Sequence, residues 1–418
     1  MQYYQFFAIR RCLVFIGITL ALVLAPVAGA TAHEKVLYHF TGGTDGAYPS
    51  SGLTTDLAGN FYGTTSAGGN TNLCTSNYNP GCGVVFQLTL SNGKWQETVL
   101  YAFQGGTDGS YPSGNLVLDA TGNIYGTTVY GGTDTTCTYG CGTVFELSPN
   151  GGGSWTKTML HSFQYYSDGA FPAGLTVDAT GNLFGVTTSG DGTAYELSPR
   201  QRGTWKETLL CSTDGANPGL TLAGKDNFFF TGVQDYNNGN VSEVKLIGKL
   251  WHETDVYDFQ GGGNGGGPKA GVVVDKHDNL YGTGDQGGND FGIVFELKRS
   301  GSHWKESMLY NFCSRNSCAD GARPQAPLVV DKAGNLYGTT ANGGTGCSLQ
   351  EGCGVVFKLA HAGTGWKETI LHSFKDQPDG SSPTEGLTLD KKGNLFGTTP
   401  LGGTGSTGGY GTVFEVTP

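Results

Sequence analysis

Short hydrophobic segments separated by Gly, Asn, Asp and Pro follow one another along the chain in a fixed order. In one stretch, an apolar segment at residues 116–119 precedes Gly-Asn-Ile-Tyr-Gly-Thr-Thr at 122–128, Gly-Thr-Val-Phe-Glu-Leu at 142–147 and a Trp-led segment at 155–160. Segments of this length, rich in β-branched and aromatic residues and bounded by turn formers, are typical of β-strands. Each unit therefore predicts four short strands, and an Asp-Gly-x-x-Pro segment leads to the next unit.

This unit recurs about every 56 residues, and all 6 Trp hold the same place in it. Seven copies are marked by the asparagine that opens the second strand: Asn60, Asn123, Asn182, Asn227, Asn279, Asn335 and Asn394. Four strands in each of seven repeats predict an all-β fold, a seven-bladed β-propeller with four antiparallel strands per blade.

The turn between the first and second strands can be derived residue by residue. Residues 119–122 (Asp-Ala-Thr-Gly) place Asp at the first and Gly at the fourth position, the preferences of a type I turn. The fourth residue is then free to take a positive φ, which Gly adopts readily and Asp tolerates. Two repeats without this Gly carry Asp226 and Asp278 there, as the turn requires.

The two ends of the repeat region predict how the ring closes. The last repeat stops at Pro418, just before a Trp-led strand would begin, and residues 33–40 align with the body of that strand. We therefore expect the N-terminal strand to complete the seventh blade, so that residues 33–418 form a single propeller. An open solenoid is the alternative, but it does not explain why the N-terminal segment resembles the fourth strand that the last repeat lacks.

Residues 1–32 are predicted to be a signal peptide. Arg10 and Arg11 precede an apolar run at 13–25, and small residues follow up to Ala32, which is the order of a secretory leader. About 13 apolar residues are too few to cross a bilayer. We expect a secreted, unanchored extracellular protein, with the periplasm as the alternative location.

Composition excludes several classes of protein. The chain has 72 Gly among 418 residues, and Gly destabilises helix interiors by about 1 kcal/mol relative to Ala. The formal net charge is −11, so phosphate backbones would repel the protein. An all-α fold and a nucleic-acid partner are therefore both disfavoured.

The recurring motifs resemble a known family. The Gly-Asn-Leu-Tyr-Gly-Thr-Thr, Gly-Thr-Val-Phe-Glu-Leu and Asp-Gly-x-x-Pro segments look like the tandem GloVer repeat of secreted bacterial proteins, which is named after Gloeobacter and Verrucomicrobia. The resemblance covers residues 34–418, with a degenerate fourth repeat at 228–232. It implies a repeat fold and export. No biochemical activity is generally assigned to the repeat, and we expect this chain to lack the surface anchor that many members carry.

Nine cysteines follow the predicted leader, and eight of them form close pairs. Local disulfides are expected for an exported chain between Cys74 and Cys82, Cys137 and Cys141, Cys313 and Cys318, and Cys347 and Cys353. Zinc is the competing interpretation, but the pair Cys137 and Cys141 has no further Cys or His pair nearby in its repeat. Cys211 stands alone and is expected to be a buried structural thiol.

Propeller topology predicts which segments share a face. The first strand of each repeat is innermost, so the segments that end at Asp56, Asp119, Asp178, Asp275, Asp331 and Asp390 should line the central channel, and the Trp-led strands should form the rim. The cysteine-bearing loops and the Asp-Gly-x-x-Pro segments should then lie on one face. That face would carry a near-complete ring of carboxylates: Asp45, Asp108, Asp168, Asp214, Asp320 and Asp379.

Two interpretations of this carboxylate ring stay open. Ca²⁺ takes six to eight oxygen ligands, so the ring is a candidate calcium site. Alternatively, Asp-Gly makes the turn through bonds to its own backbone. Aromatic residues on the same face would offer stacking surfaces for a ligand, and they are Tyr48, Tyr111, Tyr78, Tyr130, Tyr139 and Phe171.

The sequence favours a non-catalytic binding module for an extracellular polysaccharide or another envelope macromolecule. We expect a monomer that needs no cofactor, with Ca²⁺ as the one candidate. The alternative is a secreted propeller enzyme, of the lactonase or polysaccharide lyase or hydrolase type, with its site at the central channel. Its residues would come from the irregular fourth and fifth repeats: Asp235, Tyr236, Asn237, Asn238, Asp285, Asn289 and Asp290. A structural component of the envelope or matrix is the third alternative.

Overall fold

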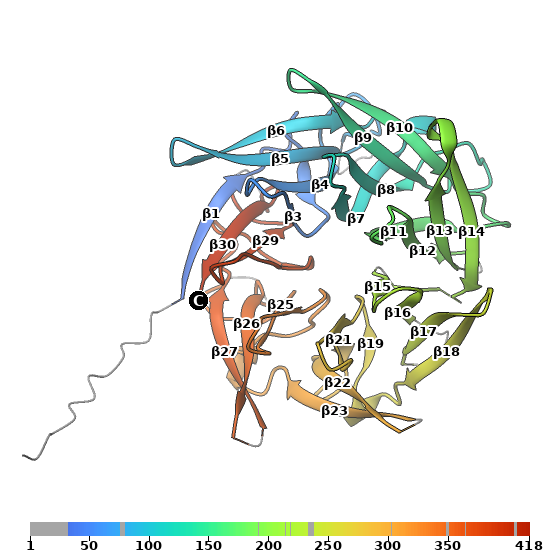
Figure 1. Cartoon of the computed structure of the whole chain (residues 1–418). Helices are drawn as coiled ribbons and strands as arrows, with labels where there is room; N and C mark the ends of the chain where they lie inside the picture. Colours follow the sequence, from blue (N-terminus) through green and yellow to red (C-terminus); the bar gives the residue numbers. More distant parts are fainter. Residues whose placement is uncertain are drawn as a thin grey trace, which may run out of the picture. The chain divides into compact units, whose positions relative to one another are not determined.

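Seven antiparallel sheets follow one another along the chain and form a ring, with each sheet as one blade (Figure 1). The computed structural model describes residues 32–418, except for 76–79, 191, 214, 218, 233–237, 302, 348–350, 364 and 405–407. The predicted signal peptide, up to residue 31, lies outside the described residues. In the described part of the chain, no helix has the length and hydrophobicity needed to cross a bilayer. The predicted all-β, seven-bladed propeller is confirmed.

In blades 1 to 6 the strands run outward from the ring centre in chain order, and in blade 7 the outer strand is β1. The innermost strands are β2 (Ala47–Pro49) with β3 (Thr54–Thr55), β7 (Ser110–Leu118), β11 (Ala170–Val177), β15 (Thr221–Leu222), β19 (Gly266–Pro268) with β20 (Val273–Val274), β24 (Val329–Val330) and β28 (Thr388–Leu389). The second strands are β4 (Phe61–Ala67), β8 (Ile124–Tyr130), β12 (Leu183–Ser189), β16 (Asn227–Gly232), β21 (Leu280–Gln286), β25 (Leu336–Thr340) and β29 (Leu395–Thr399).

The third and fourth strands complete the blades. The third strands are β5 (Val84–Ser91), β9 (Thr143–Gly151), β13 (Thr193–Pro199), β17 (Asn240–Ile247), β22 (Ile293–Ser300), β26 (Val355–Ala362) and β30 (Thr412–Thr417). The outer strands are β6 (Lys94–Ala102), β10 (Ser154–Ser162), β14 (Trp205–Ser212), β18 (Leu250–Asp258), β23 (His303–Asn311), β27 (Gly365–Ser373) and β1 (His33–His39). Short 3-10 turns are η1 (Gly106–Asp108), η2 (Gln201–Gly203), η3 (Gly262–Asn264) and η4 (Asn316–Cys318).

The ring closes through the first strand of the propeller. The last sheet has the order β1-β30-β29-β28, and β1 runs antiparallel to β30 with His33 opposite Thr417 and His39 opposite Thr412. This is the closure predicted from the sequence, so no blade is left with three strands.

Aromatic residues fill the spaces between adjacent blades. Phe103, which follows the outer strand of blade 1, packs edge-on against Phe145 of blade 2 with ring centroids 5.2 Å apart, and both are fully buried. The second-strand glycine of the motif is required here, because a Cβ on Gly126 would lie 2.5 Å from Cζ of Phe145. The same packing recurs in five further pairs: Phe40–Phe86, Phe163–Tyr195, Phe259–Phe295, Phe312–Phe357 and Phe374–Phe414.

The predicted turn between the first two strands is confirmed. Oδ1 of Asp119 accepts the backbone N–H of Thr121 at 2.8 Å and of Asn123 at 2.9 Å. Gly122 has a φ of 88°, and Asp226 and Asp278 have φ values of 60° and 61° at the equivalent position.

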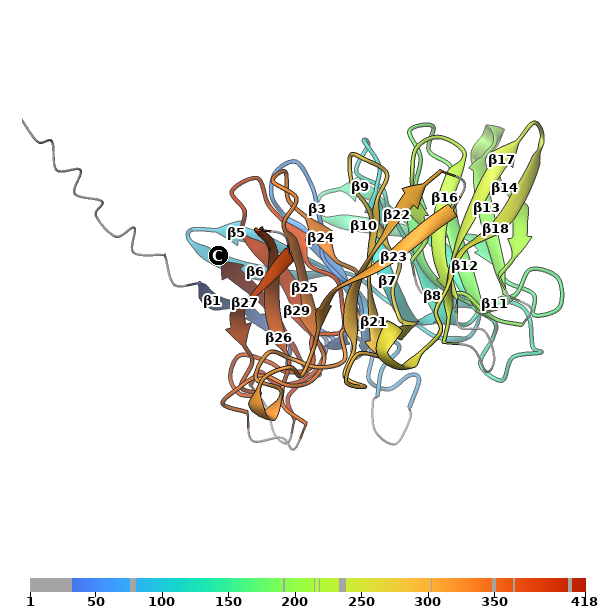
Figure 2. The same cartoon turned by 90° about the horizontal axis from the view of Figure 1, so that it is seen from below.

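The strands run between two faces, which Figure 2 shows edge-on. We call one of them the loop face; it carries the loops from second to third strands and the connections from each outer strand to the next blade. Backbone hydrogen bonds join the two kinds of loop, such as Gly132 N to Gly106 O at 3.2 Å and Gly69 N to Gly43 O at 2.9 Å. The cysteine-bearing loops and the Asp-Gly-x-x-Pro segments therefore share a face, as expected.

Candidate functional site

The aspartates of the predicted carboxylate ring are hydrogen-bonded within their own blade junctions. Asp45 accepts the backbone N–H of Thr41 at 2.8 Å and the Tyr38 hydroxyl at 3.0 Å. Asp108 is bonded in the same way by Gln104 N–H at 2.8 Å and the Tyr101 hydroxyl at 2.8 Å. Each carboxylate thereby fixes the end of an outer strand and the loop that follows it.

The other described members of the ring follow this pattern. Asp168 lies 2.8 Å from Nε2 of His161, and Asp379 lies 2.9 Å from Nε2 of His372. Asp320, which is fully buried, accepts the Tyr310 hydroxyl at 2.8 Å. Asp214 lies outside the described residues. These bonds account for the recurrence of Asp without a ligand, and calcium binding by the ring stays a prediction.

Burial and hydrogen bonding act in opposite directions on Asp320. Burial opposes its ionisation, but hydrogen bonds from Ser314 and Tyr310 outweigh burial and lower the pKa. The carboxylate is therefore held in its charged form by the loop itself.

The two aromatic residues predicted at the site, Tyr48 and Tyr111, occupy an unusual backbone position just before a proline. Their φ values are 56° and 58°, and Phe171 has 59° at the same position of blade 3. This left-handed region is unfavourable for bulky side chains, and such strain is concentrated at functional sites. The aromatic residues at this position belong to blades 1, 2 and 3. Blades 5, 6 and 7 carry Gly267, Arg323 and Ser382.

A cavity of about 730 Å³ opens on the loop face between blades 1 and 2. Its walls include the disulfide-bonded loops that carry Cys74 and Cys137, together with Tyr111, Tyr130 and Tyr139. Cavities of this size are in the range of small-molecule sites.

Tyrosines form one wall of this cavity. The ring of Tyr130 lies 5.9 Å from that of Tyr111, 5.8 Å from that of Tyr139 and 5.7 Å from that of Phe171, centroid to centroid. Tyr139 is 72% exposed and Tyr111 is 43% exposed, so both present ring surface to solvent. Tyr48 lies apart from this wall and contacts Tyr410 at 6.0 Å. Tyr78 lies outside the described residues.

Among the described residues, four disulfides join the eight cysteines as predicted. Three lie in loops between second and third strands, and Cys313–Cys318 lies in the connection from blade 5 to blade 6. The remaining thiol, Cys211, is half-buried and not fully buried as expected, and burial raises its pKa to about 12.

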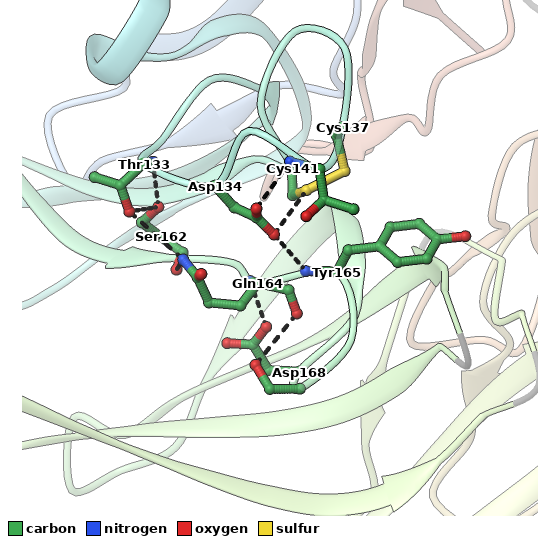
Figure 3. The surroundings of a disulfide bond; sticks show 10 residues. Thr133, Asp134, Cys137, Cys141, Ser162, Gln164, Tyr165 and Asp168 are labelled. Atoms are coloured by element: carbon green, nitrogen blue, oxygen red, sulfur yellow. Dashed lines mark hydrogen bonds between the residues drawn. A yellow bond between two sulfur atoms is a disulfide. The ribbon is translucent and has the colours of Figure 1, made fainter.

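The Cys137–Cys141 loop is fixed by more than its disulfide (Figure 3). Asp134 accepts the backbone N–H of Thr136 and that of Tyr165, each at 2.9 Å, and these bonds lower its pKa. Because Tyr165 belongs to the connection between blades 2 and 3, Asp134 ties the cavity wall to the next blade.

The charge of the cavity wall limits what it binds. Its lining contains one carboxylate, Asp134, and no Lys or Arg among the described residues. Phosphates and uronates would therefore find no basic partner. Exposed aromatic rings beside hydroxyl groups match the alternating apolar and polar faces of a neutral sugar.

The central channel holds a second cavity, of about 680 Å³, between the innermost strands. Lys269 and Glu385 are among its lining residues, and burial raises the pKa of Glu385 to about 7. Sequence reasoning missed both, although the signal was present. Glu385 breaks the repeat at a position where other blades carry Ser, Gly or Ala, and Lys269 is the one basic residue directly after the repeated proline.

Those of the irregular residues predicted for an enzyme site that the structure describes do not line this channel cavity. Asp285 is buried, with Oδ2 3.9 Å from Nζ of Lys269, and burial raises its pKa. Asn289 donates its backbone N–H to Asn311 at 3.1 Å. Asn238 accepts from the backbone of Gly267, Asp290 occupies a turn with a φ of 69°, and residues 235–237 lie outside the described residues.

Comparison with solved structures finds similar chains at low sequence identity. A provisionally assigned 6-phosphogluconolactonase from Bacteroides uniformis has 13% identity and a TM-score of 0.50, over 77% of this chain and 85% of that one. A second, from Bacteroides fragilis, has 13% identity and a TM-score of 0.49, over 84% and 87%. A luciferin-regenerating enzyme has 13% identity and a TM-score of 0.44, over 73% and 90%. At this identity the first of them supports the fold alone.

No curated protein matches the sequence. A family model described as the Gloeobacter/Verrucomicrobia repeat matches residues 24–245 and 232–418.

Proposed function

We propose a binding function for this chain, which belongs to the Gloeobacter/Verrucomicrobia repeat family: it holds a neutral extracellular polysaccharide on its loop face. The observation that carries the proposal is the cavity between two disulfide-bonded loops, walled by Tyr111, Tyr130 and Tyr139. Rigid aromatic rings provide binding surface at little cost in conformational entropy.

Export agrees with this role. Four disulfides indicate an oxidising environment, and residues 1–32 have the order of a signal peptide. We infer that the protein acts outside the cytoplasm, where polysaccharides of the envelope and of the surroundings are accessible.

Binding is tested by isothermal titration calorimetry and affinity gel electrophoresis with neutral glucans, mannans and xylans. The Tyr139→Ala and Tyr111→Ala variants should each weaken binding by about tenfold, because each loses a stacking surface of at least about 1.4 kcal/mol. Tyr166→Ala is the matched control, since Tyr166 is 87% exposed and does not line the cavity. Unchanged affinity in both cavity variants would exclude this site.

A second candidate function is catalysis in the central channel. The observation that favours it is Glu385, a channel carboxyl whose pKa is raised to about 7 by burial, in the range of a general acid. The test is the release of reducing or unsaturated ends from the same polysaccharides. Glu385→Gln should abolish that release, and a wild-type protein that releases no products would exclude catalysis on them.

A further inference from the structure

Five of the described blade junctions place three side chains together near the rim of the ring. The first is a Tyr or His near the end of an outer strand, the second is the loop aspartate, and the third comes from the outer strand of the next blade. We call these sets junction triads: Tyr38–Asp45–Glu97, Tyr101–Asp108–Lys157, His161–Asp168–Glu207, Tyr310–Asp320–Glu368 and His372–Asp379–Glu34.

Two of these triads contain a cation supplied by the protein itself. Lys157 replaces the glutamate of the second triad and places Nζ 2.9 Å from Oδ1 of Asp108, with only 6% of its side chain exposed. In the fourth triad, the Arg315 guanidinium donates to Oε2 of Glu368. The single carboxylate of the second triad and the paired carboxylates of the fourth are thus each balanced by a positive charge.

Two other triads carry histidine in place of tyrosine and have no such Lys or Arg ion pair among the described residues. Nε2 of His161 lies 2.8 Å from Oδ2 of Asp168 and 3.4 Å from Oε1 of Glu207. Nε2 of His372 lies 2.9 Å from Oδ2 of Asp379, and Glu34 completes this set. In both triads, the three ligand atoms lie within 4.8 Å of one another.

The glutamates of these two triads each have an unsatisfied carboxylate oxygen, as do the equivalent Glu97, Glu306 and Glu368 of other junctions. Oε1 of Glu34 and Oε1 of Glu207 are buried and have no hydrogen-bond partner. A buried carboxylate oxygen without a partner costs free energy. The side chains that hold the histidines in place are apolar: Phe163 lies 4.7 Å from the ring of His161, and Phe374 lies 4.8 Å from that of His372.

We propose that each of the two histidine-containing triads binds a Zn²⁺ ion. One imidazole nitrogen with two carboxylates is a ligand set for zinc, whereas calcium and magnesium prefer oxygen alone. Zinc bonds of about 2.0–2.2 Å bring ligand atoms to about 3.4 Å from one another. The separations of 2.8 and 2.9 Å between histidine and aspartate must therefore widen by about 0.5 Å when an ion binds, and the glutamate oxygens already lie within 4.8 Å of the other ligand atoms. Three protein ligands leave the fourth position to water.

The ions would act as clamps between blades. His161 belongs to blade 2 and Glu207 to blade 3, so the first ion spans that junction. The second joins His372 of blade 6 to Glu34, which lies on the closing strand β1. A metal at this position therefore fastens the one strand that comes from the opposite end of the propeller.

The experiment measures zinc bound to the exported protein, purified without an affinity tag, by equilibrium dialysis and mass spectrometry of the metal. The expected result is 2 ions per chain for the two triads. His161→Tyr and His372→Tyr should each remove one ion and the double variant both. Tyrosine is the natural residue at this position in other blades, so the variants should fold.

A matched control is Glu306→Gln. Glu306 occupies the equivalent outer-strand position of blade 5 opposite Tyr257, where there is no histidine, and its loss should leave both ions bound. Zinc should also raise the Tm of the wild type by several degrees over that of EDTA-treated protein. In the Glu34→Gln variant this rise in Tm should be smaller, because the ion at the closing junction is lost. Absence of bound zinc, or retention of both ions by the double histidine variant, would overturn the proposal.

Discussion

Lys157 lies 2.9 Å from Asp108 and joins the outer strand of blade 2 to the connection from blade 1. Its ammonium group also lies 5.7 Å from the ring centroid of Tyr101 and 5.5 Å from that of Phe103. The lysine thus contacts a carboxylate and two aromatic rings on the blade 1 side of the junction. A charge placed this way depends on all of its partners, because burial removes the water that would otherwise stabilise it.

Replacing this lysine should weaken the junction. Lys157→Met leaves Asp108 partly buried without its cation, and we expect the free energy of unfolding to fall by about 2 kcal/mol. Urea denaturation measures it. Lys206→Met, an exposed lysine of the next outer strand, should stay within about 0.5 kcal/mol of wild type. Equal effects of the two substitutions would contradict the role of the buried pair.

Glu97 should make stability depend on pH. Burial, and to a lesser extent Asp45, raise its pKa from 4.5 to about 7. The folded protein therefore keeps a proton up to about pH 7 that the unfolded chain releases near pH 4.5. Folding binds more protons in this range, so the free energy of unfolding should fall as the pH rises from 5 to 8.

The matched variant for this effect is Glu97→Gln, measured in EDTA to exclude metal binding. Partial exposure of Glu97 reduces the effect, and we expect the wild type to lose about 1–2 kcal/mol more than the variant between pH 5 and 8. Parallel pH profiles for the two proteins would show that Glu97 ionises without cost.

The fourth repeat offers a stabilising substitution. Ala223 stands where other repeats have the turn aspartate, whose carboxylate accepts the backbone N–H and the Nδ2 amide of the following Asn, as Asp119 does from Asn123. Ala223→Asp should allow Asn227 to donate the same two bonds and raise the free energy of unfolding by about 1 kcal/mol. Thermal unfolding would reveal a higher Tm. A lower Tm would mean that the turn of this repeat does not accommodate an aspartate side chain.

The Cys137–Cys141 disulfide should matter more for binding than for folding. We expect Cys137→Ser with Cys141→Ser to lower the free energy of unfolding by about 1–2 kcal/mol, because the closed loop is short. Polysaccharide affinity should fall about tenfold or more, since the loop carries Tyr139. The control removes Cys313–Cys318, which lies away from the cavity and should leave affinity unchanged.

The repeat pattern predicts the fold closely because each local signal has a single structural outcome. Gly122, Asp226 and Asp278 all take the positive φ that the turn requires. The strand at 33–40 can complete only the last blade, which would otherwise have three strands. The position of the disulfides follows from the same topology.

The candidate sites are less accessible to such reasoning because their members come from separate repeats. His161 and His372 are recognisable as a repeated position, but the glutamate opposite each belongs to the next outer strand and depends on packing across the junction. The sequence predicts Tyr111 as a site residue from its place on the loop face. Its grouping with Tyr130 and Tyr139 is a matter of loop conformation, which the local sequence does not determine.

The pairing of β1 with β30 also fixes the order in which the molecule is assembled. During synthesis β1 leaves the ribosome before every other strand of the propeller, yet its partner emerges only at the end. An unpaired strand edge is a template for association with other chains, so this interval is the period of greatest aggregation risk. The four disulfides lie between these strands in the sequence, so the loops can be cross-linked while the ring is still open.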